Sequence, residues 1–332
     1  MKKINFILFF LVIFTLSTSV VHSESFEEWK IKFSKYALSQ GVSESTLYLI
    51  IKDLKFLPKV IEYDRYQPEF YEDTSTYISK RTNNKKVNIG LKTYKQNFDL
   101  INKVEKKFNV EKELLLSLMG IETNFGKYLG KMDILSSLAT LSYDKRRSEF
   151  FTKELIIALK LIDNNKIRAN ELYGSWAGAF GNFQFMPSTI LNNAIDFNND
   201  NLIDLKSNED SFASAANYLS RMGWNTNDKC FNKIILDDKI PTKYLNYSAK
   251  QIKHKKKLSF YKKYIKNYNS NLGNDNLIVA IITPDKEIVE NSNLYSPAYL
   301  IYDNYEIILK WNRSLRFALA VCTLKDKFIN EL

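Results

Sequence analysis

The most informative stretch of this 332-residue chain is Leu114-Leu115-Leu116-Ser117-Leu118-Met119-Gly120-Ile121-Glu122-Thr123-Asn124-Phe125-Gly126. Its apolar run predicts a buried helix over 110–122. Glu122 would lie on the same face as Leu118 and Met119, four and three residues earlier. A carboxyl group on an apolar stripe is desolvated, which favours its protonated form and suits it to act as a general acid. The alternative is a glutamate at a helix end that simply reaches water.

A second motif follows about 50 residues later: Leu172-Tyr173-Gly174-Ser175-Trp176-Ala177-Gly178-Ala179-Phe180-Gly181-Asn182-Phe183-Gln184-Phe185-Met186-Pro187-Ser188. Small residues let a chain-like ligand approach the backbone, aromatic rings stack on sugar faces, and Ser and Gln side chains supply hydrogen bonds. Six of the ten glycines lie between Gly120 and Gly181, which indicates irregular backbone near a site. An acid that stays protonated, as Glu122 could, is what glycosidic cleavage requires, because the leaving oxygen needs a proton. The alternative is a tightly packed loop in which Ser188 caps a helix over 188–195.

The composition bounds the remaining possibilities. The chain is 45% hydrophobic and 26% charged, with a net charge of +11, which is typical of a globular protein and excludes wholesale disorder. Two cysteines and two histidines exclude a disulfide framework and a zinc-finger array. We expect the positive charge to face an anionic envelope polymer or a membrane surface, and we expect no nucleic-acid partner.

The first residues have the three-part pattern of an export signal. Lys2 and Lys3 precede an apolar run from Ile4 to about Leu16, and a more polar segment leads to Ser23. Cleavage near Ser23 would lower the net charge to +9 by removing the two lysines, and would leave no membrane span. The alternative is an uncleaved anchor. Export predicts a periplasmic, oxidising location, in which Cys230 and Cys322 either pair or stay as two buried thiols.

The rest of the chain reads as mainly α with some β. We expect helices over 25–60, 90–108, 147–163, 210–222 and 314–329, and an irregular polar segment over 61–88. Short β-like runs appear at 233–236, 277–282, 299–302 and 305–309.

The motifs resemble those of the B-type lytic murein transglycosylases. Ile121 to Gly126, Ser175 to Gly181 and Gln184 to Ser188 are similar to the two main motifs of that family, and shorter matches lie between and beyond them. Their order and spacing agree over roughly 110–224. The resemblance implies a lysozyme-like helical core. It divides the chain into the following expected segments: signal peptide 1–23, N-terminal helical region 24–108, catalytic core with a cation loop 109–227, small β-containing insert 228–290, and a C-terminal segment 291–332 that completes the core.

The resemblance also implies an activity. The family cleaves the β-1,4 bond between N-acetylmuramic acid and N-acetylglucosamine in peptidoglycan without water, leaving a 1,6-anhydromuramoyl end. Glu122 matches the single catalytic residue, which acts first as acid and then as base. An ordinary glycosidase uses two carboxylates, and no second acidic residue stands in the matched motifs near Glu122.

Further site residues come from the same resemblance. Ser175 and Gln184 match positions that contact sugar or position the acid, and Arg146 and Arg147 match a basic pair suited to substrate carboxylates. Phe150 stands where relatives often have Tyr. Trp311-Asn312-Arg313-Ser314 resembles a late Tyr-Asn-x-Ser element, from which Asn312 is carried over as a substrate-binding residue.

A cation loop is predicted between 196 and 210. Asp196, Asn198 and Asp200 have the spacing that opens a calcium-binding EF-hand loop, and the Leu202 carbonyl would follow. Asn201 replaces the usual glycine at the sixth position. The family resemblance suggests closure by Asp210, with Glu209 as the rival. The calcium would be structural, and the chemistry would need no cofactor. The alternative is an Asn-rich turn without metal.

Several other functions stay open. The closest is a lysozyme-like muramidase that hydrolyses the same glycan. A non-catalytic peptidoglycan-binding protein is the second, and a calcium sensor is the third. In the leading interpretation, the partners are peptidoglycan glycan strands, and we expect a monomer.

Overall fold

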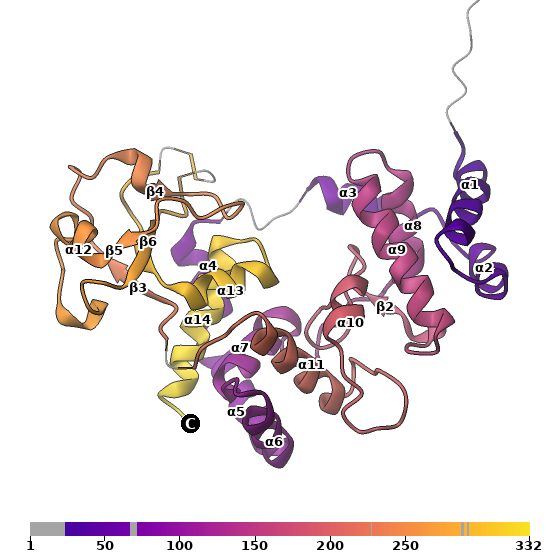
Figure 1. The fold of residues 1–332 in the computed structure, drawn as a ribbon, viewed down its shortest axis with the longest axis horizontal. Coiled ribbons are helices and arrows are strands. Elements are labelled where there is room, and N and C mark those ends of the chain that lie inside the picture. Colours follow the sequence, from indigo (N-terminus) through magenta and orange to yellow (C-terminus); the bar gives the residue numbers. More distant parts are fainter. Residues whose placement is uncertain (1–23, 67–71, 227, 287–288, 291) are drawn as a thin grey trace, which may run out of the picture.

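The computed structural model describes residues 24–66, 72–226, 228–286, 289–290 and 292–332. The predicted signal peptide, residues 1–23, lies outside them. The described part is mainly helical, with one small mixed sheet and a two-stranded ribbon, as Figure 1 shows. This confirms the predicted mainly α class with β elements. None of the helices in the described ranges is long and apolar enough to span a bilayer.

Helix α7 (Lys112–Thr123) lies at the centre of the molecule. Its Leu114 to Gly120 segment is entirely buried. The helices that pack around it are α14 (Leu315–Ile329), α5 (Asn84–Gln96), α6 (Phe98–Phe108) and α11 (Asn208–Arg221). The helix ends at Asn124, whose backbone is left-handed with φ of 51°, a conformation that Asn tolerates better than most residues. The apolar pattern of this stretch therefore predicted the correct helix.

The N-terminal helices cover different faces of the core. Helix α2 (Glu44–Ile51) packs on α9 (Ser148–Asp163), and α3 (Pro58–Arg65) packs on α8 (Ile134–Tyr143). Helix α4 (Thr74–Arg81) packs on α14, and α6 packs on α11. The segment 61–88 is not irregular as expected, because it contains most of α3 and all of α4, whose N-cap is Asp73. Their bounds are α1 Phe26–Ser39, α2 Glu44–Ile51, α3 Pro58–Arg65, α4 Thr74–Arg81, α5 Asn84–Gln96 and α6 Phe98–Phe108. The predicted division into segments stays a prediction.

The middle of the chain forms a helical layer beside α7. Helices α8 (Ile134–Tyr143) and α9 (Ser148–Asp163) pack as a pair, and α10 (Pro187–Asn193) lies between α9 and α11 (Asn208–Arg221). Strands β1 (Met132–Asp133) and β2 (Tyr173–Gly174) form the short antiparallel ribbon. Contrary to the packed-loop alternative, Ser188 does not cap α10. Pro187 begins that helix, and the buried Glu154 of α9 accepts hydrogen bonds from the backbone N–H and hydroxyl of Ser188 instead.

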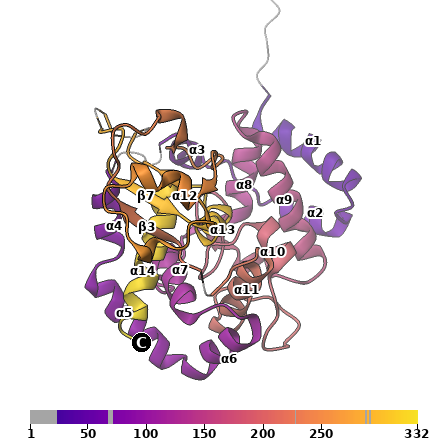
Figure 2. The same ribbon diagram turned by 60° about the vertical axis from the view of Figure 1, so that its left-hand side comes forward.

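The sheet lies at the opposite end of the molecule from α1 and α2 (Figures 1 and 2). Its strand order is β3-β7-β6-β4, and β5 pairs with β6. A second apolar cluster fills the space between this sheet and α12 (Leu258–Tyr261). The strand bounds are β3 Phe231–Ile234, β4 Leu245–Asn246, β5 Lys256–Lys257, β6 Ile278–Ile282 and β7 Ala298–Ile301. Strand β7 therefore lies beyond the insert predicted over 228–290.

The run 305–309 is helical, so the prediction of a strand there was wrong. It belongs to α13 (Asp303–Trp311), in which Tyr305, Ile308 and Leu309 are buried. Its β-branched and aromatic residues favour strands in isolation, but one face of α13 packs on α14 and tertiary burial decides the outcome.

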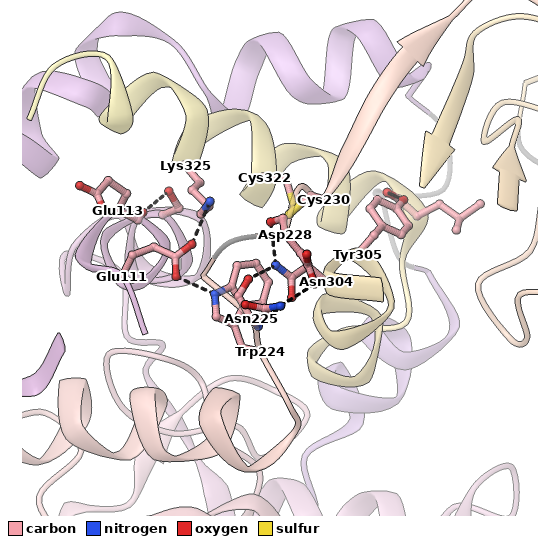
Figure 3. Close-up of a disulfide and its surroundings, with 12 residues drawn as sticks. Glu111, Glu113, Trp224, Asn225, Asp228, Cys230, Asn304, Tyr305, Cys322 and Lys325 are labelled. Atoms are coloured by element: carbon pink, nitrogen blue, oxygen red, sulfur yellow. Dashed lines mark hydrogen bonds and ion pairs between the residues drawn. A yellow bond between two sulfur atoms is a disulfide. The ribbon is translucent and has the colours of Figure 1, made fainter. Parts of the chain in front are cut away.

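Cys230 and Cys322 form a disulfide, with their Cα atoms 6.2 Å apart. Cys230 directly precedes β3, and Cys322 lies on α14 (Figure 3). The disulfide joins the residue before β3 to α14, the helix that packs on α7. It resolves the open question of the two cysteines in favour of pairing.

Candidate active site

Glu122 is the second-last residue of α7 and is half-buried. Its Oε1 accepts a hydrogen bond of 2.9 Å from the indole N–H of Trp311, the last residue of α13. The two residues are 189 positions apart in the chain. The central helix and the helix that follows the sheet therefore meet at this carboxyl group.

Aromatic rings hold Trp311 in place. Its ring centroid lies 5.2 Å from Phe185, 5.1 Å from Tyr218 and 6.3 Å from Phe183. Two of these rings come from the second motif and the third comes from α11. Burial raises the pKa of the Tyr218 phenol, so this neighbour stays neutral at ordinary pH. The result is an apolar wall beside Glu122.

The second motif is tied directly to the end of α7. The hydroxyl of Thr123, next to Glu122, donates 2.8 Å to the Asn182 carbonyl and accepts 2.9 Å from Gly126 N–H. The buried Asn182 side chain in turn donates to the Lys206 carbonyl and the Ser211 hydroxyl. Hydrogen bonds therefore link the end of α7, the loop of the second motif and the start of α11.

The glycines in this region allow close backbone contacts. Gly181 has φ of +78°, and a Cβ there would lie 2.5 Å from the Leu205 carbonyl oxygen. Gly178 has φ of +89°, and a Cβ there would lie 2.5 Å from Leu138 Cδ2. Only glycine fits both conditions at low cost. The irregular backbone that the glycine clustering predicted is present.

Ser175 and Gln184 both shape the loop of the second motif. The Ser175 hydroxyl accepts a hydrogen bond of 2.9 Å from Ala179 N–H. The Gln184 amide donates to the carbonyls of Leu129 (3.2 Å) and Gly181 (2.9 Å), which uses both of its N–H groups. The Gln184 side-chain oxygen and the Ser175 O–H are the groups that would contact a sugar, and that contact stays a prediction.

Arg146 and Arg147 both pair with one buried carboxylate. Asp64 of α3 accepts 2.7 Å from Arg146 Nε and also forms an ion pair with Arg147. Two guanidinium groups thus share one negative charge, which leaves one positive charge uncompensated within the trio. No sequence pattern indicated Asp64, because it lies 82 positions from Arg146 and 83 from Arg147.

Phe150 lies beside this pair. Its side chain is exposed and its ring meets Phe151 edge-on at 5.0 Å. A pocket of about 440 Å³ is lined by Arg146, Arg147, Phe150 and their neighbours Lys145, Ser148, Glu149 and Lys153. The pocket combines a positive charge with a stacking surface, as expected for a subsite that takes a carboxylate, and its role stays a prediction.

Asn312 directly follows Trp311 in the chain, and its backbone groups cap the end of α13. Its N–H donates 3.0 Å to the Ile308 carbonyl, and its carbonyl accepts 2.8 Å from Ser314 N–H. The preceding residue, Trp311, makes the contact with Glu122. Asn312 was the predicted site residue of this element, whereas Trp311 stands where the family pattern has Tyr. The replacement of the family's Tyr by Trp311 was the sign in the sequence that this position is unusual.

The predicted cation loop connects α10 to α11. Asp196 accepts hydrogen bonds from the N–H groups of Asp200 and Asn201, and Asp200 accepts from Leu202 N–H. Asn201 takes φ of +72°, so it adopts the left-handed conformation that glycine usually supplies. Asn198 contributes its amide oxygen, which accepts from Asp200 N–H at 3.1 Å.

Asp210 closes the loop from the first turn of α11. It is fully buried and accepts 2.8 Å hydrogen bonds from Phe197 N–H and Asp204 N–H. Burial raises the pKa of this carboxyl, and the charge of Asp196 adds to the effect. Across the described ranges, no three His, Cys, Asp or Glu side chains gather as a metal site. A cation here would therefore need the Asn198 and Leu202 oxygens as well.

Fold and site together define a class of protein: a lysozyme-like helical enzyme that presents one acidic residue at the end of a central helix. Comparison with known proteins identifies the family. Residues 25–326 match the model of the Transglycosylase SLT domain, and the chain belongs to this family.

Relatives of known structure and sequence agree with this assignment. SltB3 of Pseudomonas aeruginosa, solved in complex with NAG-anhNAM-pentapeptide, matches with a TM-score of 0.80 and 29% identity over 92% of this chain and 80% of that chain. The Escherichia coli lytic transglycosylase Slt35, solved in complex with calcium, matches with a TM-score of 0.75 and 26% identity over 91% and 93%. These likenesses confirm the expected lysozyme-like fold.

A curated sequence relative matches over a shorter range. Membrane-bound lytic murein transglycosylase B of Escherichia coli (strain K12) is 37% identical over 141 residues. The alignment covers 42% of this chain and 39% of the relative, so the chain spans well under half of that protein's length in the match.

Proposed function

We propose that this protein is an exported lytic transglycosylase that cleaves the β-1,4 bond between N-acetylmuramic acid and N-acetylglucosamine in peptidoglycan. The observation that carries the proposal is the half-buried Glu122, held by Trp311 beside the loop of the second motif. SltB3, which shares this fold, was solved with a glycopeptide whose sugar is in the anhydro form. That complex supports a peptidoglycan substrate and a non-hydrolytic product.

In the proposed reaction, Glu122 acts twice. Its carboxyl proton passes to the glycosidic oxygen as the bond from C1 to that oxygen breaks. The resulting carboxylate then takes the proton of the C6 hydroxyl while O6 bonds to C1. The 1,6-anhydro ring closes, no water is consumed, and the proton returns to Glu122. One carboxyl group therefore suffices for the whole cycle.

Other predicted residues would bind the glycan. The Ser175 hydroxyl and the Gln184 oxygen would meet sugar hydroxyl groups beside the acid, and Asn312 follows Trp311 at the same edge. Arg146, Arg147 and Phe150 would take a carboxylate of the lactyl group or peptide stem, since their pocket has an uncompensated positive charge.

Export is supported by the disulfide. A bond between Cys230 and Cys322 forms and persists in an oxidising compartment, such as the periplasm. We therefore place the mature protein there, in contact with peptidoglycan strands.

The loop 196–210 would hold a structural calcium ion. Asp196, Asn198, Asp200, the Leu202 carbonyl and Asp210 supply the hard oxygen ligands that calcium prefers. The buried Asp210 fits this role, because a cation would offset the cost of its charge. Slt35 was solved in complex with calcium. Calcium would supply no chemistry at Glu122 and would fix the loop before α11.

Digestion of purified sacculi tests the function. The released muropeptides are separated and weighed by mass spectrometry. A lytic transglycosylase yields anhydro ends, which are one water lighter than the reducing ends that a muramidase leaves. Reducing ends alone would establish the hydrolase instead, and the absence of any release by folded protein would favour a non-catalytic binding protein.

A further inference from the structure

We infer that Trp311 is a positioning residue for Glu122: its indole N–H holds Oε1 and thereby assigns the transferable proton to Oε2. The inference rests on the proposed function and deepens it, because it states which oxygen of the acid faces the chemistry. The hydrogen bond between Trp311 Nε1 and Glu122 Oε1 measures 2.9 Å, within the normal range for an N–H donor to a carboxyl oxygen.

The direction of this bond is fixed by the indole. Its nitrogen is a donor only, with no lone pair to accept a proton. Oε1 must therefore accept, and the carbonyl-type oxygen of a protonated carboxyl is the better acceptor. The proton consequently belongs on Oε2. A tyrosine hydroxyl, which the family element would place here, can donate or accept and would leave the choice of oxygen open.

The donor itself is held rigidly. The Trp311 ring packs against Phe185 and Tyr218 with centroids 5.2 and 5.1 Å away. The Tyr218 hydroxyl also donates 3.2 Å to the carbonyl of Lys310, the residue before Trp311. Both the side chain and the backbone of Trp311 are therefore fixed from α11. A rigid donor can hold the acid in one orientation through both proton transfers, which favours catalysis.

Trp311→Phe tests the inference, because it removes the N–H and keeps an aromatic ring. Trp224→Phe is the matched control. The Trp224 indole also donates to a glutamate, Glu111, at 2.6 Å, but it lies in the disulfide region (Figure 3). Thermal unfolding of both variants checks that each is folded before any other measurement.

The first readout is independent of activity. The carboxyl ¹³C shift of Glu122 is followed against pH in protein labelled with ¹³C-glutamate, with Glu122→Gln to assign the signal. Loss of a donor to the charged form should raise the Glu122 midpoint by about one pH unit in Trp311→Phe, and Trp224→Phe should leave it unchanged. An unchanged midpoint in Trp311→Phe would overturn the inference.

The second readout is kinetic. On purified sacculi, Trp311→Phe should lower kcat about tenfold with little change in KM. The variant loses the orientation of the Glu122 carboxyl group but keeps the contacts that bind the glycan. An unaltered kcat, or a loss confined to KM, would contradict a positioning role. Wild-type protein that releases no anhydro product would refute the proposed function itself, while the midpoint shift would still report on the hydrogen bond.

Discussion

The two ends of α7 carry the same interaction in different settings. At its N-cap, Glu111 accepts 2.6 Å from the Trp224 indole and pairs with Lys325 at 2.9 Å in the protein interior (Figure 3). Near its C-terminus, Glu122 accepts 2.9 Å from the Trp311 indole and is half-exposed. A hydrogen bond from a tryptophan indole to a glutamate therefore does not by itself identify an active site.

The helix dipole explains the difference. The N-terminal end of a helix favours an anion, and Glu111 forms an ion pair with Lys325 there. The C-terminal end of a helix favours a cation instead, and Glu122 lies in the last turn of α7. The same helix thus carries an ion pair at one end and, at the other, the carboxyl group that we propose as the catalytic acid.

The largest expected effect is from Glu122→Gln. An amide of the same shape keeps an oxygen that accepts from Trp311, but it cannot donate and recover a proton. Release of anhydromuropeptides from sacculi should fall about 1000-fold, with the thermal midpoint almost unchanged. Activity close to wild type would remove Glu122 from the chemistry and end the contrast between the two helix ends.

Glu111→Gln should instead lower stability and leave activity almost unchanged. It leaves the largely buried Lys325 ammonium without its charged partner, which should lower the free energy of unfolding by about 3 kcal/mol. Urea unfolding measures the loss, and kcat per folded molecule should stay near wild type. A drop in kcat without a loss of stability would show that the N-terminal end also takes part in catalysis.

The double change Cys230→Ser with Cys322→Ser probes the same structural end. Removal of a bond that closes a separation of 92 residues should cost about 2 kcal/mol, because the unfolded chain regains freedom. Reduction of the wild type should match the double variant in urea unfolding. Equal stability of oxidised and reduced wild type would mean that noncovalent packing alone holds the sheet to α14.

The smallest effect is expected from calcium at Asp210, an acid in the first turn of α11. Calcium at ten times its Kd should raise the free energy of unfolding by about 1.4 kcal/mol, and Asp210→Asn should abolish the gain. Calorimetry with and without chelator measures this. The same stability in both conditions would support a metal-free turn.

Asp210 also predicts a pH dependence for the calcium-free protein. Its pKa is raised in the folded state, so the folded protein binds more protons than the unfolded chain above the ordinary value of 3.8. Stability from this group should therefore fall as pH rises through that window. Asp210→Asn should flatten the slope, and a slope of the opposite sign would refute the assignment.

The sequence predicted those features that local pattern controls. The apolar periodicity of Leu114 to Met119 gave α7, and the glycines up to Gly181 gave the irregular loop beside it. The Asp196 to Asp200 spacing predicted a loop in which Asn201 is indeed left-handed. Each of these depends on neighbours within a few residues.

Features that depend on distant partners were missed. Trp311 reaches Glu122 across 189 positions, and Asp64 reaches Arg146 across 82. The segment 305–309 was read as a strand because its intrinsic preference points that way, and burial of α13 against α14 overrides it. Single-sequence patterns do not show which distant residues meet, although Trp311, where the family element has Tyr, was a sign that this position is unusual.

The separation between Glu122 and Trp311 also matters during synthesis. At about 5–20 residues per second, the 189 intervening positions take roughly 10–40 s to add. Until then Glu122 lacks the indole donor of Trp311, and α7 lacks α14 as a packing partner. A nascent chain that already contains both main motifs therefore has an unfinished site, and the ability to cut glycan would arise only when the last helices dock.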